Sequence, residues 1–494
     1  MLGLAPAPEL QRDDGRWFNV SRPLCLADLR GRLIILDFWT SCCVNCLHVL
    51  PTLRRIEELF SDSVLVIGVH SPKYPAEQDA ANVAHAIARH NIRHPVVHDP
   101  QLSLWQEYGI AAWPTLVFIG PDGHILGDLP GEPATEKLIS GIGEMIRCWR
   151  ASGSICPRPL PLDPDGCAPA AGRFRFPAKI KPLHRPGASK LWAIADSGHH
   201  QVVICDDDGR EIRRFGCGTP GFLDLADDAC AFNSPQGLAC NGSRVYVADT
   251  GNHAIRRIDL ETGTVCTVAG TGERGPVLEC TRRGRDAQLA SVWDLEYADG
   301  TLFFANAGTH QLGRIDLGTD EVVPLAGTGD EDLVDGVARE AQLAQPTGLA
   351  LDAAARILYF VDSETSSVRA IDIADGGRVR TLVGAGLFEC GRRNGAFAHA
   401  RLQHCRGITC WRDRLVVADS YNGILRILDL RARQVSELGG EDCCWANDQR
   451  LKGGDPAGVT ADGDHRLLVA DTNHHRLVEM TVGDDLPSAR VWSA

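Results

Sequence analysis

The chain has 494 residues, of which 44% are hydrophobic and 23% charged, and its formal net charge is −14. A chain of this length exceeds one ordinary hydrophobic core, so we expect at least two globular domains rather than a disordered protein. Because lysine and arginine are spread through an acidic excess and form no basic tract, the charge pattern argues against nucleic acid as a partner.

The sequence predicts neither a membrane segment nor a secretory leader. The first residues, MLGLAPAPELQRDDGRW, have no basic start and soon reach charged residues, unlike a signal peptide. No segment offers the roughly eighteen uninterrupted apolar residues of a membrane helix. Most cysteines, such as Cys205, Cys240, Cys266 and Cys410, stand alone in strand-like runs, which is typical of reduced, buried thiols. We therefore expect a cytoplasmic protein with no membrane partner.

Strand and helix patterns alternate over residues 32–146. Apolar runs predict strands at residues 33–38, 63–69, 94–99, 115–120 and 124–129. Apolar residues three and four apart predict helices at residues 48–60, 80–90, 100–108 and 134–149. Strands that alternate with helices and end in a hairpin predict a small α/β domain with a mixed sheet, which we place at residues 1–150.

The composition changes after this domain. Residues 151–172, ASGSICPRPLPLDPDGCAPAAG, are rich in proline and small residues, and they predict a semi-rigid linker. No helical pattern follows the linker. The remaining residues, 173–494, are repetitive.

Six copies of a short marker (VADT, FANA, FVDS, VADS and similar) define the repeat. The Asp or Asn of the marker recurs at intervals of 53, 57, 56, 57 and 52 residues, at Asp196, Asp249, Asn306, Asp362, Asp419 and Asp471. Each copy reads as four short strands joined by Gly/Asp turns. Such units bury both faces only by stacking, so we predict a six-bladed β-propeller. Its first strand lies in FPAKIK and its last in ARVWS, so the ring is expected to close without a borrowed strand.

A CxxC motif, Cys43-Val-Asn-Cys46, follows the first apolar strand and opens the first predicted helix. Backbone amides and the dipole at a helix N-terminus favour an anion, so the Cys43 thiolate should form readily there. This is the arrangement of a dithiol exchange centre. Cys43 would attack a disulfide and Cys46 would resolve the mixed disulfide.

The segment DFWTSCCVNC resembles the thioredoxin-fold stretch in which Asp, Phe and Trp precede a CxxC. Similarly, Trp113-Pro114-Thr115 resembles the cis-proline signature that lies opposite the thiols. The resemblance implies that Pro114 is cis and helps to hold the substrate, and that Asp37 is a buried carboxylate that moves the proton of Cys46. The residues expected to support the site or line its groove are Trp39, Cys42, Trp113 and Thr115.

Two departures from thioredoxins narrow the resemblance. Cys42 replaces the tryptophan that usually precedes the first cysteine, and Val44-Asn45 replaces Gly-Pro between the cysteines. A thioredoxin-like domain with Cys-Cys-x-Asn-Cys, followed by six repeats such as ADTGNHAIRRID, is similar to the family of NHL-repeat-containing protein 2. The resemblance covers about residues 9–492 and implies a thioredoxin-like domain fused to an NHL propeller.

The same segment has alternative interpretations. Cys42, Cys43, Cys46 and His48 are donor types that a metal clip could use, although adjacent cysteines rarely direct both sulfurs at one ion. Cys42 is either a third redox thiol or a cover for the site. Trp113 is either a lid over the disulfide or a core aromatic residue.

Two sets of side chains recur in phase with the propeller repeat. We interpret the histidines four residues after the marker as hydrogen-bond partners of its aspartate, rather than as metal ligands; they are His200, His253, His310 and His475. We interpret the arginines seven residues after the marker as repeat-phase residues, with a binding face as the alternative; they are Arg256, Arg369 and Arg426.

We therefore predict a thiol–disulfide oxidoreductase that needs no cofactor or metal. Its partners would be a protein or peptide substrate presented by the propeller, and a cellular reductant or oxidant. One alternative is an interaction scaffold with a redox-silent thioredoxin-like domain. Another is a propeller hydrolase with a pore-bound cation, which would gather several acidic or amide side chains at the mouth of the pore.

Overall fold

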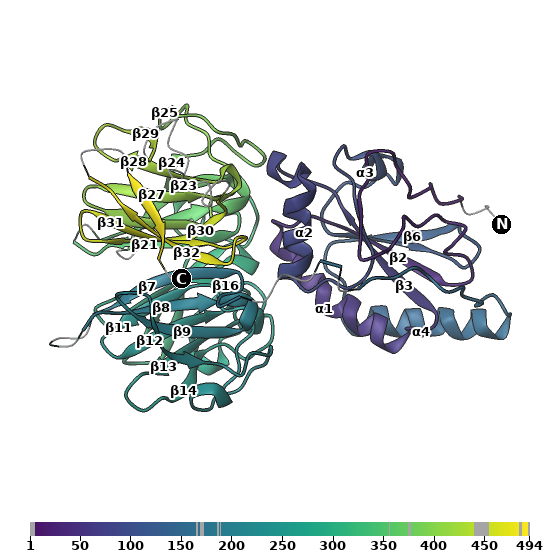
Figure 1. Cartoon of the computed structure of the whole chain (residues 1–494), viewed down its shortest axis with the longest axis horizontal. Helices are drawn as coiled ribbons and strands as arrows, with labels where there is room; N and C mark the ends of the chain where they lie inside the picture. The colour runs from purple at the N-terminus through teal and green to yellow at the C-terminus, as the bar shows by residue number, and fades with distance from the viewer. Residues whose placement is uncertain are drawn as a thin grey trace. The chain divides into compact units, whose positions relative to one another are not determined.

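The computed structural model describes residues 5–164, 166–167, 172–184, 187, 189–354, 356–373, 377–438, 454–483 and 487–492. It divides into two compact units, Met1–Ala170 and Ala171–Ala494. All α-helices of the described residues belong to the first unit, and strands build the second (Figure 1). None of these helices is long and apolar enough to cross a membrane.

The first unit is a mixed six-stranded sheet with the strand order β1-β4-β3-β2-β5-β6. The central strands β2 and β3 are parallel, whereas β5 runs antiparallel to β2. Both central strands are buried along their whole length, which explains their continuous apolar runs. The strands are β1 (Trp17–Phe18), β2 (Leu33–Trp39), β3 (Val64–His70), β4 (Val96–His98), β5 (Thr115–Ile119) and β6 (Ile125–Pro130).

Helices and loops cover both faces of this sheet. Leu33 and Ile35 of β2 pack in one cluster with buried residues of α1 and α4, whereas Ile34, Leu36 and Phe38 pack in another with the N-terminal segment and α3. Every strand and helix predicted over residues 33–149 is confirmed; the two-residue edge strand β1 was not predicted. The helices are α1 (Val44–Leu59), α2 (Ala80–Arg89), α3 (Ser103–Glu107) and α4 (Thr135–Ala151).

The proline-rich segment after α4 lies along the first unit as far as Asp163. The Asp163 amide donates to the Asn19 carbonyl at 2.8 Å, and the Cys156 amide donates to the Gly31 carbonyl at 2.9 Å. Gly31 has a φ of +81°, and a Cβ there would lie 2.4 Å from the Cys156 carbonyl oxygen. The segment is therefore held by backbone pairing, which its composition alone did not predict.

The second unit is a six-bladed propeller, as predicted, and each blade is an antiparallel sheet. The strands of blades 1 to 3 are β7 (Pro177–Leu183), β8 (Leu191–Asp196), β9 (Gln201–Asp206) and β10 (Glu211–Phe215); β11 (Leu238–Asn241), β12 (Arg244–Asp249), β13 (Ala254–Asp259) and β14 (Val265–Ala269); and β16 (Val292–Ala298), β17 (Thr301–Asn306), β18 (Gln311–Asp316) and β19 (Glu321–Ala326). The strands of blades 4 to 6 are β21 (Pro346–Asp352), β22 (Ile357–Asp362), β23 (Ser367–Asp372) and β24 (Arg378–Val383); β26 (Gly407–Trp411), β27 (Arg414–Asp419), β28 (Ile424–Asp429) and β29 (Gln434–Glu437); and β30 (Pro456–Asp462), β31 (Arg466–Asp471), β32 (Arg476–Thr481) and β33 (Ser488–Val491).

Blades 3, 4 and 5 each carry a short fifth strand on the outermost strand: β15 (Arg282–Arg283), β20 (Gly336–Val337) and β25 (Gly395–Ala396). These two-residue strands have no apolar alternation and were not predicted. All strands of blades 1 and 6 come from their own repeats, so the ring closes without a borrowed strand, as expected.

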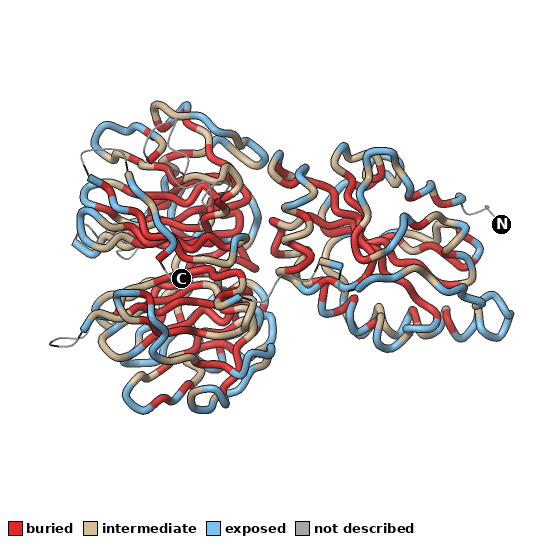
Figure 2. The backbone as a smooth tube through the Cα atoms, viewed as in Figure 1, coloured by how far each residue is buried: buried red, intermediate tan, exposed pale blue. Residues whose placement is uncertain are grey.

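Figure 2 shows that much of the strand backbone of the propeller is buried, whereas many of its outer loops are exposed. The marker Asp or Asn is buried at the end of the second strand in each blade. Each carboxylate or amide oxygen accepts a backbone N–H from the loop that enters the same blade, at 2.7 to 2.9 Å. The N–H donors are those of Arg175, Asn233, Ala290, Ala344, Gln403 and Asp455. The first two strands of each blade lie between the donor and the acceptor, so this bond ties the entry loop to the end of the second strand.

In four of the six entry loops, the next residue donates its backbone N–H to a histidine of the preceding blade. Ser234 donates its N–H to His200 Nδ1 at 3.0 Å, and Phe176 donates to His475 Nδ1 at 3.0 Å, which joins blade 6 to blade 1. His253 and His310 accept in the same way. The predicted Asp–His bond within the turn was therefore wrong. Each histidine has a φ near +50° and joins two blades instead.

The repeat arginines are structural. Arg256, Arg369 and Arg426 are fully buried, and each guanidinium faces the marker carboxylate of its own blade. Arg369 Nη1 lies 2.9 Å from Asp362 Oδ2, and Arg256 Nη1 lies 2.8 Å from Asp249 Oδ2. These arginines are therefore not available as a binding face.

Ion pairs fill the centre of the ring. Lys179 of blade 1 pairs with Asp294 of blade 3, and Lys181 pairs with Glu296 in the same way. Both ion pairs therefore join blades that are not neighbours in the ring. The hollow lined by Lys179, Asp294 and their neighbours measures only about 10 Å³, which is the space of about one water molecule. In the described part of the channel these carboxylates are neutralised by lysines, which does not favour the alternative of a pore-bound cation.

Replacing Arg369 by methionine should strongly destabilise the propeller, because Asp362 would remain as an unpaired buried charge. We expect a loss of about 3 kcal/mol in the free energy of unfolding, measured by urea titration. Adding Asp362→Asn to the Arg369→Met variant should restore part of the lost free energy of unfolding, because no buried charge then remains. Arg431→Met, at a side chain that is 85% exposed, is the control. Equal effects of Arg369→Met and Arg431→Met would contradict the structural role of the pair.

Candidate dithiol site

The end of β2 and the start of α1 place the two cysteines. Cys43 is the N-cap of α1, with φ −80° and ψ 114°, and Cys46 lies in the first helical turn. The first turn of α1 holds no acidic residue, so none of its own side chains opposes a thiolate at the N-terminus of the helix. Residues three apart share a helix face, and the two thiols are hydrogen-bonded to each other. All described cysteines carry free thiols.

The environments of the two thiols differ. Burial raises the pKa of Cys46 well above its ordinary value, and the hydrogen bond and negative charge of Cys43 and the charge of Asp37 raise it further. Cys43 keeps 5% of its surface exposed and Cys46 keeps 1%. The pair thus has a slightly more accessible member at the helix end and a protonated member beneath it, so Cys43 is the better placed to attack and Cys46 needs a proton acceptor before it can resolve the mixed disulfide.

Asp37 is a buried carboxylate in the middle of the sheet. It is fully buried, and neither side-chain oxygen has a hydrogen-bond partner among the described residues. Burial raises the pKa of Asp37 to about 7, against a smaller lowering by His94. A group with this pKa can accept or release a proton near neutral pH. Since its charge acts on Cys46, it is placed to respond to that thiol.

The Trp113–Pro114 peptide bond is cis, as the resemblance implied. Thr115 is the register partner of Phe38, so Pro114 lies next to the last residue of β2, from which the CxxC segment continues. Thr115 Oγ1 donates to the Ala112 carbonyl at 2.8 Å and holds the turn before the proline. The sheet register therefore brings the proline to the edge that carries the cysteines.

The two tryptophans support the site in different ways. Trp39 is only 1% exposed and meets the His70 ring edge-on, with the ring centroids 4.9 Å apart, so it packs in the core beneath the site. Trp113 is half-buried. Its indole N–H donates to the Ser71 carbonyl at 2.9 Å, and its ring lies 4.1 Å from that of Trp105.

Glu77, which the sequence analysis missed, holds the loop before the cysteines. Its Oε1 accepts from the Ser41 hydroxyl at 2.6 Å and the Cys42 N–H at 3.1 Å. Its Oε2 accepts from the Thr40 hydroxyl at 2.7 Å. The amides of Lys73 and Tyr74 also donate to Oε2, at 2.9 and 3.2 Å.

Although burial alone would raise the pKa of Glu77, His70 and the hydrogen bonds lower it, so the carboxylate is ionised at neutral pH. In the segment SPKYPAEQD, no sequence pattern marks Glu77 as part of a site. The only local feature that Glu77 has is its position three residues after Tyr74, which is that of a capping box.

Cys42 and His48 have partners away from the Cys43–Cys46 pair. The Cys42 thiol lies 3.8 Å from Glu77 Oε2 and 3.5 Å from Thr40 Oγ1. His48 Nδ1 lies 3.1 Å from Glu132 Oε1. These contacts direct both side chains to carboxylates, which does not favour the alternative of a metal clip at this segment.

Replacing Asp37 by asparagine should change how stability depends on pH. Asp37 holds its proton more tightly in the folded chain than in the unfolded chain, so it lowers the free energy of unfolding as the pH rises from 3.8 to about 7. Asp37→Asn should therefore be more stable than the parent by about 4 kcal/mol at pH 8, and by much less at pH 5. Urea titration of the reduced protein measures this. Asp128→Asn, at an exposed aspartate, is the control. Parallel pH profiles of stability for the parent, Asp37→Asn and Asp128→Asn would contradict the raised pKa of Asp37.

Glu77→Gln keeps the shape of the side chain but replaces one acceptor oxygen by a donor amide. At least one hydroxyl or backbone N–H of the loop then loses its acceptor, and we expect a loss of about 2 kcal/mol in the free energy of unfolding. The alkylation rate of Cys43 should also change, because the loop that precedes it is released. Glu136→Gln, on an exposed side chain of α4, should leave both quantities unchanged. If Glu77→Gln did the same, Glu77 would not hold the loop.

Comparison with known proteins agrees with both units. A thioredoxin-like family model matches residues 31–125, and an NHL repeat model matches residues 454–479. In its N-terminal part the chain is also 24% identical to the thiol-disulfide oxidoreductase ResA of Bacillus thuringiensis, over 23% of this chain and 63% of that protein. This distant similarity relates the first unit to proteins with thiol–disulfide chemistry.

Two relatives match almost the whole chain. NHL repeat-containing protein 2 of Bos taurus is 36% identical, over 93% of this chain and 68% of that protein. Protein SUPPRESSOR OF QUENCHING 1, chloroplastic, of Arabidopsis thaliana is 34% identical, over 95% of this chain and 46% of that protein. Because the match is 36% identical and covers more than two thirds of the bovine and the Gallus gallus relatives, this chain belongs to the NHL repeat-containing protein 2 family.

Proposed function

We propose that this protein is a thiol–disulfide oxidoreductase whose redox pair is Cys43 and Cys46. The observation that carries the proposal is a free dithiol at the start of α1 together with a buried, unbonded carboxylate of pKa about 7, Asp37. A structural pair of cysteines would not need a proton acceptor inside the sheet, where burying a carboxylate without a hydrogen bond destabilises the fold.

The proposed reduction follows from these positions. The Cys43 thiolate attacks one sulfur of a substrate disulfide, the substrate S–S bond breaks, and one substrate thiolate leaves. Asp37 takes the proton of Cys46, whose thiolate then attacks the Cys43 sulfur of the mixed disulfide. The second substrate thiolate leaves, and Cys43 and Cys46 remain as a disulfide. Two electrons pass to the substrate, and a cellular dithiol returns the pair to its reduced form. Run backwards, the same steps oxidise a dithiol.

We propose a protein or peptide as the substrate, with the propeller as its docking platform. The fold supports this assignment because a six-bladed ring offers a large surface, whereas its described channel is closed by ion pairs. The cytoplasm is the proposed location. The many isolated cysteines of the propeller suit a reducing compartment, in which they remain thiols.

A redox-silent thioredoxin-like unit on an interaction scaffold is the second candidate. The burial of Cys46 and its strongly raised pKa favour it, because a thiol that keeps its proton resolves mixed disulfides slowly. The two candidates differ in whether the pair has a measurable reduction potential. Titration against a dithiothreitol redox buffer should give one two-electron transition for an oxidoreductase and none for a silent unit.

Insulin reduction by the full chain with dithiothreitol tests the proposal directly. Cys43→Ser should lower the rate at least tenfold, to the uncatalysed rate, because no nucleophile remains. Cys46→Ser should instead trap a stable mixed disulfide on Cys43, visible by mass spectrometry after reaction with a small disulfide reagent. Cys148→Ser, at an exposed cysteine of α4, is the control. Equal rates for the parent and Cys43→Ser would refute the enzymatic assignment.

A further inference from the structure

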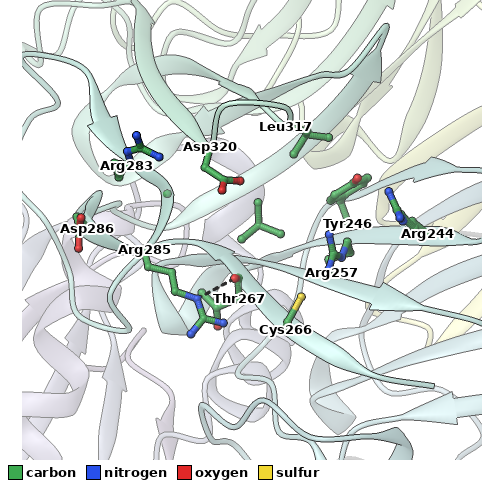
Figure 3. Close-up of a pocket in the computed structure, with 12 residues that line it drawn as sticks. Arg244, Tyr246, Arg257, Cys266, Thr267, Arg283, Arg285, Asp286, Leu317 and Asp320 are labelled. Atoms are coloured by element: carbon green, nitrogen blue, oxygen red, sulfur yellow. Dashed lines mark hydrogen bonds between the residues drawn. The ribbon is translucent and has the colours of Figure 1, made fainter. Parts of the chain in front are cut away.

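A basic hollow of about 410 Å³ lies between blades 2 and 3 of the propeller (Figure 3). Its lining includes four arginines and two aspartates, so it has an excess of two positive charges in a chain of net charge −14. Arg244 and Tyr246 come from β12, Arg257 comes from β13, and Arg283 comes from the short strand β15. The aspartates are Asp286 and Asp320.

Three of these arginines lack a close carboxylate partner within the described chain. Arg257 and Arg283 form no ion pair there, and Arg257 Nε is buried with no hydrogen-bond partner. Arg244 Nε is 4.0 Å from Asp259, at the limit of an ion pair. A buried guanidinium N–H without an acceptor is costly, so a ligand that supplies an acceptor would be favoured here.

The repeat shows that the fold does not require these arginines. Arg244 opens the second strand of blade 2, and Arg257 is the fourth residue of its third strand. The other five blades have Leu191/Ile204, Thr301/Arg314, Ile357/Ala370, Arg414/Ile427 and Arg466/Glu479 at these positions. Only blade 2 has arginine at both positions, whereas the buried repeat arginines recur in blades 2, 4 and 5.

A second hollow, of about 310 Å³, adjoins the first and shares Thr267 and Arg285 with it. Phe222 forms part of its wall. Phe222, Leu223 and Leu225 are 41%, 47% and 47% exposed, so an apolar patch lies beside the arginines. Arg285 Nη2 lies 2.9 Å from Asp224 Oδ2 at the boundary between the two hollows.

We propose that this two-hollow surface, which we name the blade 2–3 surface, binds an acidic peptide segment of a partner protein. Carboxylates of the peptide would pair with Arg244, Arg257 and Arg283, and a neighbouring apolar side chain would occupy the hollow beside Phe222. A small anion would use only the first hollow, and the net charge of −14 disfavours a nucleic acid. The inference rests on the docking role proposed for the propeller and is independent of the thiol chemistry.

Fluorescence anisotropy with a labelled peptide of repeated Glu-Glu-Leu units, added to the full chain, tests the proposal. Arg244→Gln combined with Arg257→Gln should weaken binding at least tenfold. Arg414→Gln changes the same strand position in blade 5 and is the matched control. Leu225→Ser should weaken binding less, against Ile212→Ser as its control at another exposed apolar residue. Circular dichroism and the unfolding midpoint confirm that the variants are folded.

A Gln-Gln-Leu peptide should bind at least tenfold more weakly than the acidic one. Equal binding of the two peptides, or equal loss in the double variant and Arg414→Gln, would overturn the proposal. Two further outcomes would overturn the proposal. One is that inorganic phosphate alone competes with the peptide for the same arginines, and the other is that single-stranded oligouridylate binds more tightly than the peptide in an arginine-dependent way.

The failure of this proposal can be distinguished from the failure of the thiol–disulfide proposal. Cys43→Ser should bind the peptide with unchanged affinity, and the double variant should still react with a small disulfide at the parent rate.

Discussion

Two adjacent backbone N–H groups at the entrance to five of the six blades hold the propeller together. The first donates to the buried marker Asp or Asn of its own blade, and the second, in four of the six joints, donates to a histidine of the preceding blade. Between blades 4 and 5 the hydroxyl of Ser366 replaces the histidine. Between blades 5 and 6, Pro456 occupies the second position and has no N–H to donate. Because unpaired buried amides are costly, this pairing accounts for the repeat better than any single apolar contact.

The dithiol site uses the same principle with a different acceptor. A single carboxylate, Glu77, gathers hydroxyl and amide donors from two loops and so fixes the approach to Cys43. Asp37 differs from it, because no donor in the described chain satisfies its oxygens. The two buried carboxylates of the site therefore have different tasks: Glu77 is satisfied and holds structure, whereas Asp37 is unsatisfied and can change its protonation.

The sequence predicted those parts of the fold that leave a periodic pattern of apolar residues or a repeated motif. The central strands, the four helices, the six blades and the placement of Cys43 at a helix start all follow from local spacing. Contacts that depend on side-chain direction were not predictable in this way. The spacing of His200 after Asp196 was read as a bond within one turn, but a left-handed residue at that position turns the ring toward the next blade. Glu77 and the two-residue edge strands carry no periodic signal, and the pairing of residues 156–163 with the first unit depends on loop geometry.

The joint between Phe176 and His475 has the same chemistry as three of the five joints inside the ring. The seam where the two ends of the propeller meet is therefore not special: no strand is exchanged and no separate clasp is needed. The stability of such a ring depends on the contacts of each blade with its neighbours more than on which two blades hold the chain ends. A circularly permuted gene, cut between two other blades, would encode the same closed ring, and the evolution of this family could have moved that seam without redesigning the circle.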